Sequence, residues 1–242
     1  MPPMSWLKAE ARSGPACREL EAVSMLTDRY KNAIQFAIEL HDGHMRKGTQ
    51  IAYLSHLISA SALVMENGGE EDEAIAALLH DALEDQGDDY QSTLGVAEPR
   101  SGREALKRDL ESLYGSRVRD IVVACTDDED FQKPPADEIG QVEAWMERKA
   151  HHIQRLESQP DIGVLRVACA DKLHNARSLL LDHQEHGDAL WQRFRSQSRD
   201  NVVWYLSGMA TVFRRRAERE GDAGLRRLVS ELEAVTDRIR SL

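Results

Sequence analysis

Hydrophobic positions along the chain recur at the three- and four-residue spacing of amphipathic helices. The first clear helix follows Thr27, a side chain suited to cap a helix N-terminus, and it ends near Gly43. Its apolar face is formed by Tyr30, Ile34, Ala37, Ile38 and Leu40. Nowhere does the sequence alternate apolar and polar residues convincingly, as a half-buried strand would. The pattern predicts an all-α fold, a bundle of several helices.

Further helices are expected along the rest of the chain, separated by glycine, proline and polar stretches. The pair Gly68-Gly69 and the single Gly115 mark two of these boundaries. The expected helices cover Tyr53–Asn67, Glu71–Asp85, Glu104–Tyr114, Ser116–Cys125, Val142–Glu157, Ile162–His183, Asp188–Glu220 and Leu225–Leu242.

The helices divide the chain into three predicted parts. Residues 1–22 carry several prolines and glycines and are expected to be a loose arm; residues 23–208 form one compact domain; residues 209–242 form a helical extension. Residues 126–139 are an acidic loop that contains two adjacent prolines. The amphipathic face of the extension can pack on the domain or pair with a second subunit, so the oligomeric state stays open and a dimer is possible.

Composition narrows the class of protein. The chain has 242 residues, with 31 basic against 42 acidic side chains and a net charge of −11. A strongly acidic balance disfavours nucleic-acid binding, which depends on neutralising phosphates. No apolar run reaches the roughly 20 residues needed to span a bilayer. Three cysteines without metal-like spacing favour a reducing compartment. We expect a soluble, cytoplasmic protein with neither a membrane nor a nucleic-acid partner.

One helix end gathers a histidine and three carboxylates. His80, Asp81, Glu84 and Asp85 follow an apolar run and, on a continuous helix, would form two neighbouring stripes. Carboxylates this close resist joint ionisation unless a cation holds them. The alternative is a solvated acidic helix end, which such a cluster by itself does not exclude.

A second polar stripe lies inside an apolar helix further along. Asp171, His174, Asn175 and Ser178 share one face, and a buried carboxylate needs a partner such as a metal. His56 stands between apolar residues of another predicted helix, where a lone histidine is more often a hydrogen-bonded core residue. Together with His80 and Asp81, however, it would complete a set of two imidazoles and two carboxylates. Such a set suits Mn, Fe, Co or Zn.

These residues form the H…HD…D pattern of the HD-domain metal-dependent phosphohydrolases. The surrounding segments resemble, in order and spacing, the (p)ppGpp hydrolase domain of the RelA/SpoT family. They are HDGHMRKGTQIAYLSHLI, LLHDALED, LYGSRVRDIVVACTD, RKAHHI and ADKLHN. The resemblance covers about Tyr30 to Ser178. It implies that residues 23–208 are an HD hydrolase domain and that the chain is a stand-alone small alarmone hydrolase.

The resemblance also implies roles for individual residues. His56, His80, Asp81 and Asp171 become the ligands of one Mn(II), although another divalent transition metal is possible. Glu84 and Asp85 become the catalytic pair that orients and deprotonates the attacking water. The substrate-binding residues become Arg46, Lys47, Lys149, Asn175 and Ser178. The implied reaction releases pyrophosphate from the 3′ position of (p)ppGpp and leaves GDP or GTP.

Several positions depart from the pattern of that family. His44 stands where a glutamine is usual, and Ala52 and Leu57 stand where prolines are usual. These changes leave the expected ligands intact, but they leave open which nucleotide is the substrate. The alternatives are another nucleotide, such as (p)ppApp or NADPH, or a non-catalytic nucleotide-binding module. His41 and His44 could add ligands for a second metal, but we expect them to be surface or loop histidines.

Overall fold

The chain forms an all-α structure, which confirms the predicted fold class. The computed structural model describes residues 26–91, 101–126, 138–194 and 198–242. The predicted arm at 1–22 and most of the acidic loop at 126–139 lie outside the described residues. The helices are α1 Asp28–Leu40, α2 Leu54–Glu66, α3 Glu71–Leu79, α4 Ala82–Gln86, α5 Gly102–Tyr114, α6 Ser116–Cys125, α7 Glu138–Glu157, α8 Ile162–His186, the 3₁₀ helix η1 Gly187–Arg193, α9 Arg199–Glu220 and α10 Ala223–Arg240.

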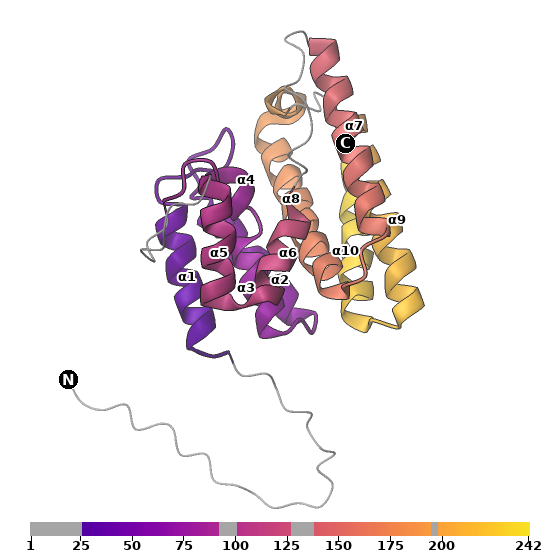
Figure 1. Ribbon diagram of the computed structural model, residues 1–242. Helices are drawn as coiled ribbons and strands as arrows, with labels where there is room; N and C mark the ends of the chain where they lie inside the picture. The colour runs from indigo at the N-terminus through magenta and orange to yellow at the C-terminus, as the bar shows by residue number, and fades with distance from the viewer. Residues whose placement is uncertain (1–25, 92–100, 127–137, 195–197) are drawn as a thin grey trace, which may run out of the picture.

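Helix α8 runs through the middle of the molecule. Figure 1 shows α1 to α6 gathered on one side of it and α7, α9 and α10 on the other. Its sequence explains this position, because twelve of its residues are buried. The Arg166 guanidinium fixes α8 on both sides: it binds the Glu73 carboxylate of α3, and its Nη2 lies 2.5 Å from Asp222 Oδ2 at the start of α10. The polar stripe of α8 is therefore held against α2 and α3.

The helix predicted over Glu71–Asp85 is interrupted at His80 and Asp81, and there the prediction was wrong. Helix α3 ends at Leu79 and α4 begins at Ala82. The Ala77 carbonyl, which a regular helix would pair with the Asp81 amide, lies 2.8 Å from His80 Nδ1. On a continuous helix, neighbouring side chains diverge by about 100°. The interruption instead brings His80 Nε2 within 2.9 Å of Asp81 Oδ2.

The single helix predicted over Asp188–Glu220 was also wrong. Helix α8 ends at His186; the next residue, Gly187, has a φ of 57° in the left-handed region that favours glycine, and it begins the short 3₁₀ helix η1. Helix α9 begins only at Arg199, where the Ser198 hydroxyl accepts a hydrogen bond from the Asn201 amide at 3.1 Å. A serine cap satisfies an amide that the first helical turn leaves unpaired. The Ser198 cap therefore sets the start of α9 inside a stretch whose apolar pattern predicted one continuous helix.

The loop between α1 and α2 is held by backbone hydrogen bonds and carries Arg46 and Lys47. The Arg46 amide donates to the Ile51 carbonyl at 2.8 Å, and the Tyr53 amide donates to the His44 carbonyl at 2.8 Å. An isolated antiparallel bridge joins Met45 and Ala52. These hydrogen bonds hold the loop backbone in place and thereby orient the Arg46 side chain.

Helices α9 and α10 pack on each other and on α8, so the C-terminal segment adds to the central core. Helix α9 continues through the predicted boundary at residue 208 without interruption. The three-part division stays a prediction. Among the described residues, every helix is too short or too polar to cross a membrane.

Candidate metal centre

Four predicted ligands from three parts of the chain converge on one space. His56 comes from α2, His80 and Asp81 from the turn between α3 and α4, and Asp171 from α8. The two imidazole Nε2 atoms lie 3.3 Å apart. Asp171 Oδ1 lies 3.2 Å from His56 Nε2 and 3.6 Å from His80 Nε2, and Asp81 Oδ2 lies 2.9 Å from His80 Nε2. Atoms bound to one metal at about 2.0–2.2 Å are separated by comparable distances.

The outer nitrogens of both imidazoles are hydrogen-bonded, which determines their tautomers. His80 Nδ1 donates to the Ala77 carbonyl at 2.8 Å. His56 Nδ1 lies 2.8 Å from His174 Nδ1, and Arg46 Nη1 lies 3.2 Å from that same His174 atom. Because a guanidinium can only donate, His174 Nδ1 is an acceptor, and the His56 Nδ1–H donates to it. Both Nε2 atoms therefore face the carboxylates, where they can hydrogen-bond to them or, once deprotonated, ligate a metal.

The electrostatics of this cluster favour a bound cation. Burial by itself would lower the pKa of His80, but the Asp81 and Asp171 carboxylates outweigh it and hold that pKa well above 6.5. Burial would raise the pKa values of both carboxyls, yet their neighbours hold them below 3.8: the charge and hydrogen bond of His80 for Asp81, and the Lys172 charge with hydrogen bonds from His56 and His80 for Asp171. The residues therefore place two carboxylates in a buried site that needs positive charge. The donor set of imidazole nitrogens and carboxylate oxygens fits a first-row divalent metal.

Glu84 and Asp85 lie on the short helix α4, directly after the expected ligands. Burial is the main cause that raises the pKa of Asp85 to about 7, and the Asp81 and Glu84 carboxylates add to it. A carboxyl with a pKa near neutrality can both accept and return a proton at physiological pH. Glu84 is exposed at the same end of the cluster.

Arg46 and Asn175 connect the α1–α2 loop to the face of α8 that carries Asp171. Arg46 Nη2 donates to Asn175 Oδ1 at 3.2 Å, and Asn175 Nδ2 donates to Asp171 Oδ1 at 2.5 Å. Two of the expected substrate contacts thus touch each other and an expected ligand.

The other expected substrate contacts are Lys47, Lys149 and Ser178, and the structure gives a neighbour for each. Lys47 is exposed, with Nζ 5.8 Å from the centre of the Phe194 ring. Lys149 of α7 has Nζ 5.3 Å from the centre of the Tyr205 ring. The Ser178 hydroxyl donates to the His174 carbonyl of its own helix at 3.0 Å.

Three residues beside the site were absent from the predicted ligand and contact sets. His174 orients His56, the Tyr53 hydroxyl donates to Asp81 Oδ2 at 2.5 Å, and Lys172 Nζ lies 2.5 Å from Asp171 Oδ2. The place of His174 in the polar stripe of α8 was a usable signal. Tyr53 gave none, because its partner comes from a distant part of the sequence.

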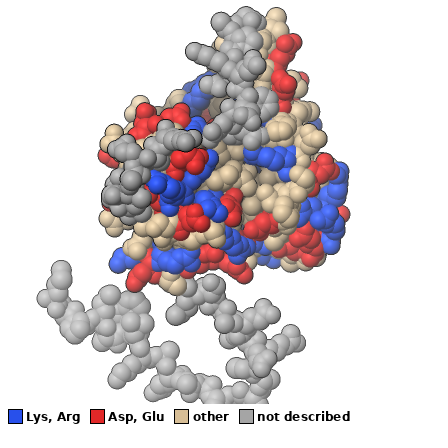
Figure 2. All heavy atoms as spheres, viewed as in Figure 1, with Lys and Arg blue, Asp and Glu red and all other residues tan. Residues whose placement is uncertain are grey.

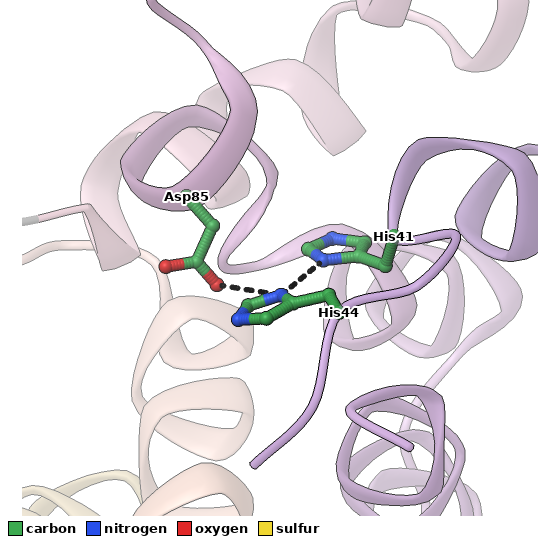
Figure 3. Close-up of side chains that lie close together, drawn as sticks. All are labelled: His41, His44 and Asp85. Atoms are coloured by element: carbon green, nitrogen blue, oxygen red, sulfur yellow. Dashed lines mark hydrogen bonds and ion pairs between the residues drawn. The ribbon is translucent and has the colours of Figure 1, made fainter. Parts of the chain in front are cut away.

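His41 begins the loop after α1, as expected of a loop histidine, but it does not lie at the surface, because it is only 4% exposed. It belongs to a second group with His44 and Asp85, whose ligand atoms all lie within 4.8 Å of one another. Figure 3 shows the His44 ring between the other two side chains. Burial, together with the nearby His44, lowers the pKa of His41 to about 4.

Comparison with known proteins points to one family. The family model of the HD domain matches residues 33–197. A probable guanosine-3′,5′-bis(diphosphate) 3′-pyrophosphohydrolase of Synechocystis is 27% identical over 149 residues, which is 61% of this chain and 16% of that protein. The chain therefore matches only a small part of such long relatives.

A shorter relative and a solved structure extend the comparison. The Danio rerio guanosine-3′,5′-bis(diphosphate) 3′-pyrophosphohydrolase MESH1 is 26% identical over 149 residues, covering 60% of this chain and 66% of that protein. A solved metazoan ortholog of SpoT superposes with a TM-score of 0.53 over 86% of this chain and 95% of its own, at 22% identity. The likeness to that structure is one of fold.

Proposed function

The chain belongs to the HD domain family, and from that premise we propose that it hydrolyses the 3′-pyrophosphate of (p)ppGpp, assisted by Mn(II). The products would be GDP or GTP and pyrophosphate. Two relatives in the comparison carry the name of this activity.

One observation supports the proposal: the Arg46 guanidinium lies beside the candidate metal centre. Arg46 contacts His174 and Asn175, and through them it is one residue removed from His56 and Asp171. A planar guanidinium can stack on a base and pair with phosphate. A metal-dependent hydrolase for a nucleotide needs this combination, whereas a structural metal site does not.

His56, His80, Asp81 and Asp171 would hold the metal. When bound, it would supply Lewis-acid polarisation of the scissile phosphoryl group and favour ionisation of water. Asp85, with its pKa of about 7, would take a proton from the attacking water, and Glu84 would orient that water. Water adds to the phosphorus that bears the 3′ oxygen, the P–O3′ bond breaks, and the 3′ oxygen gains a proton.

The basic side chains around the site would hold the polyphosphate. The chain carries a net charge of −11, so it needs local positive charge to attract a polyanion. On the face seen in Figure 2, Lys and Arg side chains are interspersed with Asp and Glu. Lys149 and Lys172 both lie over the Tyr205 ring, with Nζ at 5.3 and 5.8 Å from its centre. We propose that Lys149 and Lys47 contact phosphate and that Asn175 and Ser178 contact the nucleoside.

A turnover assay tests the proposal. Metal-stripped full chain is loaded with Mn(II) and incubated with ppGpp, pppGpp, ppApp, NADPH and simple nucleotides, and the products are identified by chromatography. GDP and pyrophosphate from ppGpp are the expected result. Turnover of another nucleotide, with ppGpp left unhydrolysed, would show that ppGpp is not the substrate. Thermal stabilisation by ppGpp without turnover would overturn the reaction and indicate a binding module.

A further inference from the structure

A second cluster of metal-ligating side chains lies beside the candidate metal centre. His41 ends α1, and its amide donates to the Ala37 carbonyl at 3.1 Å. The His44 amide donates to the His41 carbonyl at 3.0 Å, so a single turn presents both imidazoles together. Asp85 reaches them from α4, and His44 Nδ1 lies 3.8 Å from its Oδ2.

The two imidazoles are held in place by an aromatic neighbour. The Tyr53 ring stacks on His44, with centroids 4.2 Å apart and an angle of 16° between the planes. It also lies against His41 at 5.5 Å. The two imidazole planes are within 14° of each other. Few side-chain rotations are therefore needed to bring the ligand atoms around an ion.

The distances suit a shared ion. His41 Nδ1 and His44 Nδ1 are 3.2 Å apart. Two ligands bound at about 2.0–2.1 Å to a tetrahedral ion lie about 3.3 Å from each other. Without an ion, one imidazole must donate its Nδ1–H to the other. A bound metal would replace that proton.

His41 also carries an unsatisfied polar atom. Its Nε2 is buried and has no hydrogen-bond partner within the part of the chain that the structure describes. A buried polar nitrogen without a partner is destabilising. The Nε2 atom lies on the side of the ring opposite Nδ1, so the case for an ion rests on the Nδ1 atoms and the Asp85 carboxylate.

We propose that His41, His44 and Asp85 bind a second divalent transition metal, separate from the ion expected at His56, His80, Asp81 and Asp171. Two imidazoles and one carboxylate are a donor set typical of Zn(II), Co(II) and Ni(II), and they leave coordination positions open. Hard ions such as Mg²⁺ and Ca²⁺ prefer all-oxygen sites and are excluded on that ground. The proposal does not depend on the proposed hydrolysis.

The shared carboxylate gives this site a consequence for the proposed reaction. An ion that binds Asp85 removes the carboxylate that would accept the proton from water. Occupancy of the second site would therefore inhibit turnover, and this part of the inference rests on the proposed function.

Metal stoichiometry tests the site with no need for a substrate. Metal-stripped full chain is titrated with Co(II), followed by its visible absorption and by elemental analysis after desalting. We expect two equivalents for the unaltered chain, one for His44→Gln, one for Asp81→Ala, and none for the double variant. Loss of an outer-shell partner alone weakens metal binding by about 10–100-fold, so loss of the ligand His44 should weaken the second equivalent by about 100-fold or more.

Each other outcome of the titration overturns the site. One equivalent in the unaltered chain and none in Asp81→Ala would mean that His41 and His44 form only a hydrogen-bonded pair. Two equivalents in His44→Gln would place the second ion elsewhere. Far-ultraviolet circular dichroism of each variant excludes misfolding, and His44→Asn repeats the test should His44→Gln fail to fold.

A second measurement examines the link to Asp85. With Mn(II) at the first site, Zn(II) beyond one equivalent should inhibit the unaltered chain, and His44→Gln should need about 100-fold more Zn(II) for the same inhibition. Equal inhibition of the unaltered chain and of His44→Gln would overturn the inference that an ion at the second site inhibits turnover by binding Asp85. Two Co(II) equivalents together with absent turnover would leave the site intact and reject the hydrolase proposal instead.

Discussion

His174 Nδ1 lies 2.8 Å from His56 Nδ1, while His56 Nε2 lies 3.2 Å from Asp171 Oδ1. Because Arg46 also donates to the same His174 atom, the His56 ring is held with its Nε2 toward the carboxylates. His174 is thus a positioning residue that connects an expected substrate contact with an expected metal ligand. It acts through His56, with which it shares the hydrogen bond.

We predict that His174→Phe keeps the fold and weakens Mn(II) binding by about 10–100-fold, the usual effect of losing an outer-shell partner of a metal-bound imidazole. The measurement is a competition titration against a chelator. His174→Asn, whose side-chain oxygen can still accept from His56, should recover part of the affinity. Equal Mn(II) affinity in the Phe variant and the unaltered chain would contradict this role.

Asp81→Ala should lose the metal and the turnover together. It removes a carboxylate that lies 2.9 Å from His80 Nε2 and leaves the buried site with less negative charge to hold a cation. Elemental analysis after dialysis, beside a ppGpp assay, measures both. Asp88→Ala, an exposed carboxylate on the same segment, is the matched control and should change neither quantity.

Glu84→Ala should keep the metal while its turnover falls. Because Glu84 would orient the water from which Asp85 takes a proton, we expect kcat to fall by up to the roughly 10²–10⁴-fold that a positioned base contributes. Metal content and single-turnover rate are measured on the same preparation. Full activity in this variant would remove Glu84 from the catalytic pair.

Arg46→Ala should raise KM more than it lowers kcat, provided that its contact with the nucleotide is equal in the ground and transition states. Arg46→Lys keeps the charge but not the planar group, so it should recover phosphate attraction and not base stacking. Initial rates at varied ppGpp concentration give both constants. An unchanged KM in Arg46→Ala would exclude Arg46 from the nucleotide site.

The buried His41 predicts a loss of stability in acid. Its pKa is about 4 in the folded chain against 6.5 ordinarily, so between these pH values the unfolded chain binds more protons. The free energy of unfolding should therefore fall as the pH falls, by about 2–3 kcal/mol from this group between pH 7 and 4.5. Urea unfolding with EDTA at both pH values measures it. His41→Phe should lose correspondingly less, and equal losses would contradict the assignment.

The sequence by itself determined the all-α class, most helix boundaries and the motif residues. These properties are local: apolar spacing selects a helix, Thr27 caps one, and a glycine pair ends another. The family resemblance also depends only on short segments in order, and the HD family match over residues 33–197 agrees with it.

Only the tertiary structure decided how distant side chains are oriented. The bond from His174 to His56 and the approach of Asp85 to His41 and His44 join segments far apart in sequence, whereas the turn at His80 and Asp81 is local and interrupts an otherwise helical pattern. Helical periodicity predicts which face of a helix is buried, but not the rotation of one helix relative to another. That rotation comes from packing against α8, and it determines which ring nitrogen faces a carboxylate and which faces a hydrogen-bond partner.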